Sequence, residues 1–255
     1  MLSIAERKEE LYKMLRQWGW LNTGLFIVNR ILSIVSRGHV RLYKYHLIAQ
    51  PVAKETLVPQ GRGKKIEIRL IQENDEIIKK FPRPAAAIQS RFKQGAKCLV
   101  ALKEGEFAGF LWLLMGSYQE DEVRARYVPL PPGRSAWDFD VYVAPPFRLG
   151  LTFMRLWDHA NRMLNENGIS WSCSRISAFN TGSLGAHARL GILFLGSAIF
   201  FCAGRWQITL ASIHPFIHLS TRAGSFPEFQ LDTGQLETIG PSPTTNQPRS
   251  DHAAP

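Results

Sequence analysis

The middle of the chain alternates between two hydrophobic patterns. Short runs with a period of two predict strands, and longer runs with a period near 3.6 predict helices. The predicted strands are Ile66–Ile71, a hairpin within 97–116, 136–143, 170–177 and a pair within 192–211, and the predicted helices are 73–81, 84–95, 150–168 and 180–191. This order favours an α/β (α+β) fold with a mixed, mostly antiparallel central sheet and helices on both faces.

Two amphipathic helices are predicted before this pattern begins. Residues 3–18 and 21–36 each carry an apolar stripe, and Gly19 separates them, so we expect an N-terminal helical hairpin. Polar residues lie opposite the second stripe, at Asn22, Asn29, Ser33 and Ser36. Such a helix fits a membrane interface, the main domain or a second subunit. The apolar run 20–35 is too short to span a bilayer.

The remaining segments divide the chain. Residues 50–65 contain two Pro, two Gly and a charge cluster, which is typical of a linker. Periodicity is lost from Ala211, and the end of the chain is rich in Pro, Ser, Thr and Asn, which predicts disorder. We expect N-terminal basic helices over 1–49, a linker over 50–65, the main domain over 66–210 and a largely disordered extension over 211–255.

Charge and cysteine content narrow the function classes. The net charge is +10, and residues 1–65 hold twelve Lys and Arg but four Glu, which favours an anionic partner. The basic residues form no recognisable nucleic-acid module, so nucleic acid is not expected. The three Cys have neither zinc-site nor disulfide spacing, so no metal is expected. The charged first residues do not fit a secretory signal, which favours the cytoplasm, with the inner face of a membrane as a peripheral location.

The segment from Trp137 to Asn161 carries the most chemistry. Strand alternation predicts Asp138 and Asp140 on one face of a strand that ends at two Pro residues. A turn with Arg148 and Gly150 follows, and it leads into a helix. Because the first turn of a helix leaves N–H groups unpaired and carries partial positive charge, this turn fits a diphosphate.

From Ile66 to Leu210 the chain resembles the GCN5-related N-acetyltransferase (GNAT) superfamily. In that family a strand ends in a V-x-P-x-x-R/Q-x-x-G-x-G/A turn that holds the pyrophosphate of CoA. The sequence VAPPFRLGLT matches Val143, Pro145 and Arg148, but Gly150 comes one residue early and Thr152 replaces the second small residue. The resemblance implies acetyl-CoA or another acyl-CoA as co-substrate, with these residues in contact with it: Val141, Val143, Arg148, Leu149, Gly150, Leu151 and Thr152.

A second family motif, N-x-x-A/S-x-x-x-Y-x-K/R-L-G-F, follows the next strand. Its positions here are Asn180, Ser183, His187, Arg189, Leu190, Gly191 and Ile192. The resemblance implies that Asn180 and Ser183 line the channel for the pantetheine arm. His187 stands where the family often keeps a Tyr that protonates the departing thiolate, and a His can donate a proton near neutral pH.

Direct acyl transfer needs a base for the amine and a donor for the oxyanion. The resemblance places the backbone donor within 141–143, where the family's sheet splits. Asp138 and Asp140 are the candidate bases, with hydrogen-bonded structural carboxylates as the alternative interpretation. The acidic run 120–122 lies where acceptors often bind in the family, and a solvated loop is its alternative.

These motifs predict an N-acyltransferase that moves an acyl group from acyl-CoA to an amine in a ternary complex. One alternative is a long-chain acyltransferase that uses acyl carrier protein, similar to N-acyl amino acid or homoserine lactone synthases. Another is a module that binds acyl-CoA or a partner without turnover. The basic N-terminal helices would meet an anionic membrane or a carrier protein, and a homodimer is a further possibility. The acceptor amine is not specified by these residues.

Overall fold

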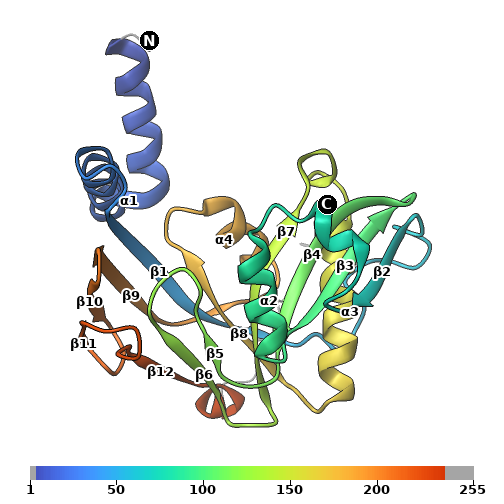
Figure 1. Ribbon diagram of the computed structural model, residues 1–255. Helices are drawn as coiled ribbons and strands as arrows, with labels where there is room; N and C mark the ends of the chain where they lie inside the picture. Colours follow the sequence, from blue (N-terminus) through green and yellow to red (C-terminus); the bar gives the residue numbers. More distant parts are fainter. Residues whose placement is uncertain (1–3, 239–255) are drawn as a thin grey trace, which may run out of the picture.

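Two β-sheets form the framework of the protein. The computed structural model describes residues 4–238 of the 255-residue chain. The larger sheet has the strand order β11-β10-β9-β1-β8-β7-β4-β3-β2, and the smaller has the order β12-β6-β5 (Figure 1). The strands are β1 (Val40–Pro51), β2 (Ile66–Ile71), β3 (Lys97–Lys103), β4 (Glu106–Leu114), β5 (Tyr118–Gln119), β6 (Arg126–Leu130), β7 (Ser135–Val143), β8 (Trp171–Ser177), β9 (Leu193–Ala203), β10 (Trp206–Ala211), β11 (Ile217–Ser220) and β12 (Glu228–Asp232). All neighbours in the larger sheet are antiparallel except β7 and β8, which confirms the mixed, mostly antiparallel sheet.

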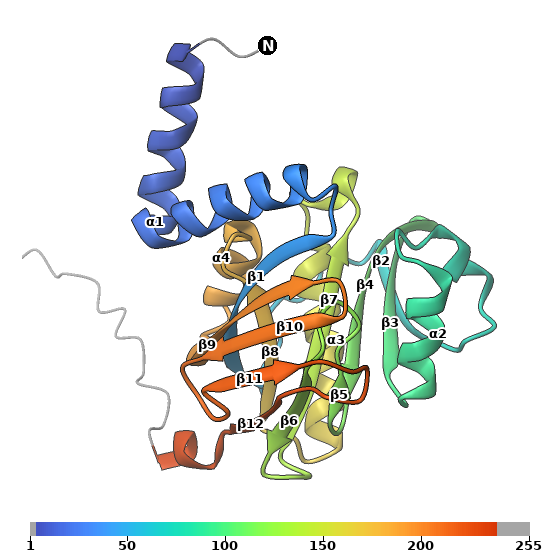
Figure 2. The same ribbon diagram turned by 60° about the vertical axis from the view of Figure 1, so that its left-hand side comes forward.

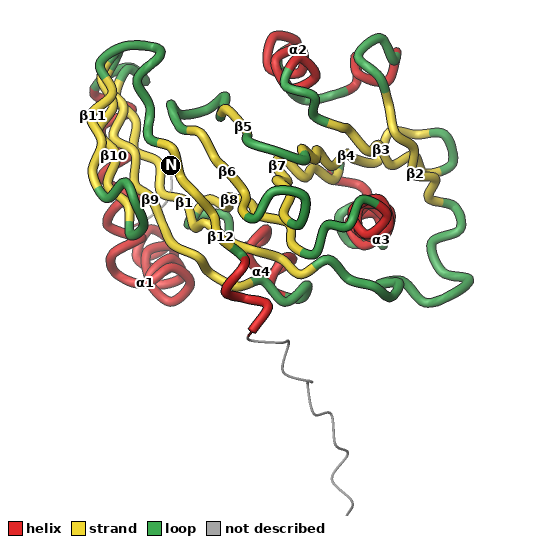
Figure 3. The backbone as a smooth tube through the Cα atoms, turned by 90° about the horizontal axis from the view of Figure 1, so that it is seen from below, coloured by secondary structure: helices red, strands yellow, loops and turns green. Residues whose placement is uncertain are grey.

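Helices lie on both faces of the larger sheet, as predicted. The helices are α1 (Ile4–Val35), α2 (Ala85–Lys93), α3 (Thr152–Glu166) and α4 (Thr181–Ala188), with short 3-10 turns η1 (Glu76–Lys80), η2 (Pro145–Phe147) and η3 (Gly234–Thr238). Figure 3 shows α2 and the smaller sheet on one face, and α1, α3 and α4 on the other. A separate core fills each side: Trp112 and Trp137 are buried under the smaller sheet and α2, and Trp157 of α3 is buried on the other side. The expected helix over 73–81 is only the turn η1.

The strand β1 lies in the centre of the larger sheet, although we grouped most of its residues with the N-terminal helices. It pairs with β8 on one side and with β9 on the other. The periodicity missed it because its second half is buried on both faces, so the run from Leu47 to Gln50 does not alternate. The strands β11 and β12 and the turn η3 lie in the extension that we expected to be largely disordered. The Pro-rich end, 239–255, lies outside the described residues.

The expected N-terminal helical hairpin is not present. The structure has one element, α1, which changes direction at Gly19, where the backbone adopts a non-helical φ of 74° and ψ of 170°. A positive φ costs glycine little, so the kink occurs at this residue. Figure 2 shows that the arm after Gly19 lies along β1, whereas the arm before it extends away from the sheet. Within residues 4–238, no helix has the length and hydropathy needed to cross a membrane.

Candidate active site

The strands β7 and β8 separate in the middle of the sheet. Their parallel pairing covers Ser135 to Trp137 on β7 and stops at Cys173 on β8, although both strands continue. Just past this point the Ser174 hydroxyl donates to the backbone carbonyl of Asp138, with an Oγ–O distance of 2.9 Å. The separation opens the sheet between β7 and β8, next to the N-terminal end of α4.

A β-bulge in β7 turns Asp140 away from Asp138. Asp140 has a φ of 49°, and the pairing with β4 shifts between Phe110 and Trp112. A bulge places two consecutive residues opposite one partner residue and so breaks the alternation of side chains. Asp138 faces the side of α3, and Asp140 faces the side of α2. Our expectation that the two carboxylates share one face is therefore wrong.

The predicted CoA-contacting residues divide into two groups. A cavity of about 710 Å³ runs between the end of β7 and α4. From the predicted set it contains Val141, Val143, Arg148, Asn180 and Ser183, and it also contains Arg83, Tyr142, Phe153, Thr181, Gly182, Gly185, Ala186 and Arg189. The small side chains of α4 leave this space open, and the arginines give it positive charge. Asn180 also caps α4, because its Oδ1 accepts from the Ser183 N–H at 3.0 Å.

The turn before α3 contributes less to this cavity than the motif suggested. Leu149, Gly150, Leu151 and Thr152 are not among the residues that line it. Leu149 is fully exposed, and Thr152 is buried as the first residue of α3. Arg148 folds back, with its Nε donating to the carbonyl of Val143 at 3.1 Å. No side chain caps the helix at Leu151, so the first-turn N–H groups of α3 keep their capacity for an anion.

His187 is buried between α4 and α3. Its ring meets Phe153 and Trp157 edge-on, and its Nδ1 lies 3.0 Å from the Gln50 Oε1. An amide oxygen only accepts hydrogen bonds, so Nδ1 carries the hydrogen and Nε2 has the free lone pair. Burial lowers the pKa of His187 to about 4, so the ring is neutral at pH 7. The ring therefore lacks the second proton that a donor to a thiolate would supply.

Asp138 is a buried carboxylate at the point where the strands separate. It lines a cavity of about 190 Å³, with Asp140, Val141, Asn180 and His187 also in the wall. The Ser172 hydroxyl donates to its Oδ2 at 2.6 Å, while its Oδ1 has no hydrogen-bond partner among residues 4–238. Burial raises the pKa of Asp138 to about 7, although the hydroxyls of Ser172 and Ser174 partly offset this.

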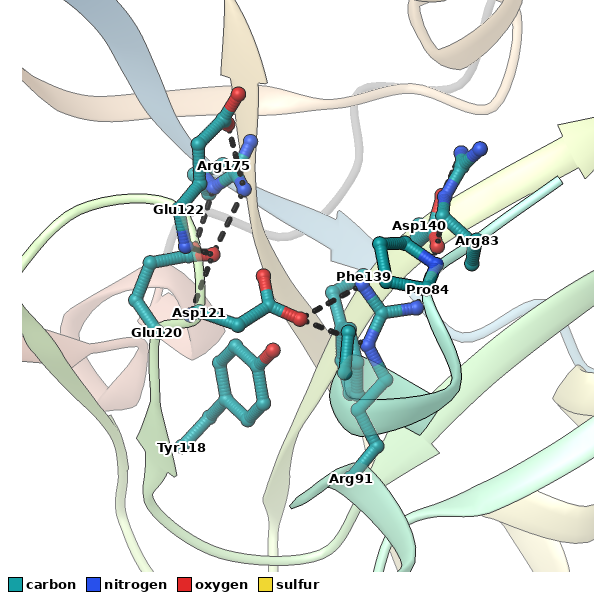
Figure 4. Close-up of a pocket in the computed structure, with 11 residues that line it drawn as sticks. Arg83, Pro84, Arg91, Tyr118, Glu120, Asp121, Glu122, Phe139, Asp140 and Arg175 are labelled. Atoms are coloured by element: carbon teal, nitrogen blue, oxygen red, sulfur yellow. Dashed lines mark hydrogen bonds and ion pairs between the residues drawn. The ribbon is translucent and has the colours of Figure 1, made fainter. Parts of the chain in front are cut away.

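A third cavity, of about 470 Å³, lies on the α2 side of the bulge and contains most of the charged groups. Figure 4 shows Asp121 pointing toward the Arg91 guanidinium and Arg83 reaching Asp140. Arg91 contacts Asp140 at 2.5 Å and Asp121 at 2.9 Å, and it is almost fully buried. Arg175 binds Glu120 with two hydrogen bonds, at 2.6 and 2.9 Å. The predicted acidic run is therefore a loop that forms a wall of this cavity, with Glu120 buried and Asp121 and Glu122 exposed.

The pKa values of two neighbouring carboxyl groups in this wall, those of Glu120 and Asp121, are shifted in opposite directions. Burial would raise the pKa of Glu120, but the charge and hydrogen bonds of Arg175 outweigh it and lower that pKa. Burial raises the pKa of Asp121, with the charge of Glu120 adding to the effect and Arg91 opposing it. Within residues 4–238, no three His, Cys, Asp or Glu side chains are placed to hold a metal ion.

Apart from Arg148, the arginines of these cavities are absent from the predicted catalytic and CoA-contacting residues. Arg83 and Arg91 flank the small-residue segment of α2, Arg175 is on β8, and Arg189 ends α4. Arg189 occupied a named position of the second motif, so that signal was available. Arg91 gave no signal, because a buried Arg inside a short helix looks like any exposed helical Arg until its partners are known.

Solved structures give the only matches to this chain, since no protein-family model and no curated protein matches it. One is a GCN5-related glucosamine N-acetyltransferase region of a fungal multi-domain GH3 β-N-acetylglucosaminidase, with 18% identity, a TM-score of 0.44, and coverage of 66% of this chain and 22% of that one. Another is a tandem GNAT protein from the clavulanic acid biosynthesis pathway, with 12% identity, a TM-score of 0.44, and coverage of 67% and 57%. A third is a GCN5-related N-acetyltransferase from Sphaerobacter thermophilus, with 16% identity, a TM-score of 0.43, and coverage of 68% and 54%. The solved structures that this chain is similar to thus include several GCN5-related N-acetyltransferases, and fold similarity at this level leaves the reaction open.

Proposed function

We propose that the protein transfers an acyl group from acyl-CoA directly to an amine. One observation supports this most: β7 and β8 separate, and three cavities meet there. Asp140 borders both the 470 and the 190 Å³ cavities, and Asn180 and Ser183 border both the 190 and the 710 Å³ cavities. A donor and an acceptor that enter from opposite sides would meet beside Asp138 and Val141.

The 710 Å³ cavity fits the arm and phosphates of CoA. Thr181, Gly182, Gly185 and Ala186 leave room for a narrow chain along α4, and a Cβ at Gly185 would meet no atom within 4 Å. Arg148 and Arg189 supply positive charge for phosphates. When bound, acyl-CoA supplies the thioester that activates the acyl group. The bulge leaves residues 140 and 141 without regular pairing to β4, so we assign the Val141 N–H as donor to the thioester oxygen.

Asp138 is our candidate for the proton-transfer group. The attacking amine must lose a proton, and the departing sulfur must gain one. A carboxyl group with a pKa near 7 can accept the first proton and return it, because both of its forms are populated at neutral pH. His187, held neutral against Gln50, is assigned a positioning role at the same cavity in place of the predicted proton donor. We place the acceptor amine in the 470 Å³ cavity, where the Asp121 carboxylate faces the space.

A substitution that fills the cavity without disturbing the fold tests this proposal. Gly185→Leu places a side chain into the space reserved for CoA, and Leu favours a helix over Gly by somewhat less than about 1 kcal/mol. We expect a stable protein whose melting temperature no longer rises with CoA or acetyl-CoA and whose acyl transfer is lost. Gly24→Leu is the matched control, because Gly24 also has open space around it on a helix and lines none of these cavities.

The outcome with the wild-type protein separates the alternatives. A rise in melting temperature with acyl-CoA, and release of free thiol with an amine panel, would support the proposal. Stabilisation by acylated carrier protein and by no CoA ester would favour the carrier-dependent alternative. Binding of acyl-CoA without thiol release from any amine would favour the non-catalytic module. Equal stabilisation of wild type and Gly185→Leu by CoA would place the CoA site elsewhere.

A further inference from the structure

The arm of α1 after Gly19 attaches to the main domain through polar side chains and one aromatic side chain, Phe26. The Asn22 Oδ1 accepts from the Lys44 Nζ, and the Asn29 Oδ1 accepts from the Leu42 N–H, both at 2.7 Å. A helix that docks on its own domain normally buries its apolar stripe. Here polar residues and Phe26 hold the helix in place, and most of the large apolar residues of the stripe face outward.

The outward stripe consists of large apolar residues. Its exposed members are Trp20, Leu21, Ile27, Val28, Ile31, Ile34 and Val35, with Trp20 80% and Val35 78% exposed. The arm contains one charged residue, Arg30. Burying such a stripe in an apolar environment is favourable in proportion to its area, so leaving it in water is unfavourable.

The stripe is next to an apolar sheet face. Leu42, which lies under α1, pairs with Phe201 of β9; Phe201 pairs with Ile208 of β10, and Ile208 pairs with Leu219 of β11. Residues paired in this way point to the same side of a sheet. Phe201, Ile208 and Leu219 are exposed, because α1 covers β1 but not β9 to β11. Figure 2 shows α1 beside these strands. We name the stripe together with this sheet face the apolar surface.

The exposed apolar residues of the described chain are concentrated here. Among the residues whose side chains the structure describes, nineteen large hydrophobic residues are exposed, and sixteen of them lie between Trp20 and Val35 or between Leu193 and Leu219. Scattered single apolar residues need no explanation, but a continuous surface of this kind indicates a protein or membrane contact.

Charge distinguishes the two kinds of contact. The segments 11–54 and 193–227 contain no Asp or Glu, while they contain nine Lys and Arg. Two copies of the surface in a symmetric dimer would bring like charges together, because a two-fold interface pairs a patch with itself. An anionic lipid surface has the opposite charge and an apolar interior, so it complements both properties.

We propose that the apolar surface docks the protein peripherally on an anionic membrane. The α1 stripe would enter the headgroup region, with Trp20 and Trp206 at the level where aromatic side chains prefer to lie. Arg30, Arg37 and Arg205 would face the lipid phosphates. This inference does not depend on acyl transfer, and its test requires no turnover.

Vesicle sedimentation with the full chain tests the proposal. We expect binding to phosphatidylcholine vesicles that contain one-third phosphatidylglycerol, at least ten-fold weaker binding to phosphatidylcholine alone, and weaker binding at high salt. Ile31→Glu and Ile208→Glu should each weaken binding about ten-fold, since each replaces an exposed apolar side chain with an anion. Leu70→Glu is the matched control, because Leu70 is an exposed apolar residue on β2, at the opposite end of the sheet.

Three results would overturn the proposal. The first is no binding to anionic vesicles. The second is an equal loss of binding in Leu70→Glu, which would mean that added negative charge alone explains the effect. The third is a wild-type dimer in analytical ultracentrifugation that Ile31→Glu converts to a monomer, which would make the apolar surface an interface between two copies. Thermal melts of each variant check that the fold is retained.

Discussion

Asp138 and Asp140 lie two positions apart on β7 and have opposite surroundings. Asp138 faces hydroxyl groups, one of its oxygens has no hydrogen-bond partner among the described residues, and burial raises its pKa to about 7. Asp140 faces two guanidinium groups, and ion pairs hold both of its oxygens. The bulge between them makes one residue of the strand irregular. As a result, one carboxyl group faces hydroxyl groups and the other faces guanidinium groups.

Different surroundings give these two identical side chains different roles. A buried carboxyl without a cation resists ionisation and is available for proton transfer near neutral pH. A carboxylate between arginines forms ion pairs with both and fixes the arginines in place.

Exchanging each carboxylate for an amide should separate rate from stability. We expect Asp138→Asn to lower kcat by about 10²- to 10⁴-fold, the usual contribution of a general base, without loss of stability, because an amide is cheaper to bury than a carboxylate. Asp140→Asn should lower stability and reduce kcat much less. Steady-state kinetics and urea unfolding measure the two effects. Full activity in Asp138→Asn would remove this residue from the mechanism.

Removing each of the two arginines that bind Asp140 should show which ion pair contributes more to the stability of the protein. Arg91 is buried and shared between Asp140 and Asp121, so Arg91→Met should lower the free energy of unfolding by about 3–5 kcal/mol, the cost of leaving buried charges unpaired. Arg83 is partly exposed, so Arg83→Met should cost less than about 1 kcal/mol. Urea titration at pH 7 gives both values. Equal losses would mean that burial does not distinguish the two pairs.

The pH dependence of stability should contain two opposing slopes. Folding raises the pKa of Asp138 from near 4 to about 7. The contribution of this group to the free energy of unfolding is therefore complete below pH 4 and is lost as the pH rises through 7. The loss amounts to about 2 kcal/mol between pH 5 and 7. Folding lowers the pKa of His187 from 6.5 to about 4. The contribution of this group to the free energy of unfolding is therefore present above pH 6.5 and is lost as the pH falls toward 4. This loss is also about 2 kcal/mol, between pH 7 and 5.

These two slopes nearly cancel in the wild type, and single variants expose them. Relative to wild type, Asp138→Asn should gain stability as the pH rises from 5 to 7, and His187→Phe should lose it. Unfolding titrations at several pH values measure both differences. Parallel curves for the three proteins would show that neither group titrates as its burial implies.

The sequence allowed the prediction of most of the strands and of the helices α3 and α4, because each has its own period and end signals. It did not predict β1, whose burial on both faces removes the alternation. The sequence also could not predict that Asp140 faces the α2 side of the sheet. Side-chain alternation assumes a regular strand, whereas the bulge in β7 depends on how closely β4 packs beside it. A Cβ at Gly109 would lie 2.3 Å from the Tyr142 carbonyl oxygen, so that approach requires glycine.

The candidate site also combines features that have a local sequence signal with features that depend on tertiary packing. The motif positions Asn180, Ser183, Arg148 and Val143 line one cavity, together with Val141, which the resemblance places where the sheet splits. The protonation state of His187 depends on Phe153, Trp157 and Gln50, which come from α3 and β1. No local pattern around His187 contains that information, because pKa values depend on the assembled surroundings.

The central position of β1 has a consequence for how the chain folds. Residues 40–51 find both of their neighbours only in residues 171–203, so the middle of the sheet closes over a very long loop. Contacts of such high sequence separation form slowly, and during synthesis β1 must wait unpaired until β8 and β9 have left the ribosome. In that interval an apolar strand and the stripe of α1 are exposed together. A nascent chain of this protein therefore exposes apolar segments that stay unpaired for most of its synthesis.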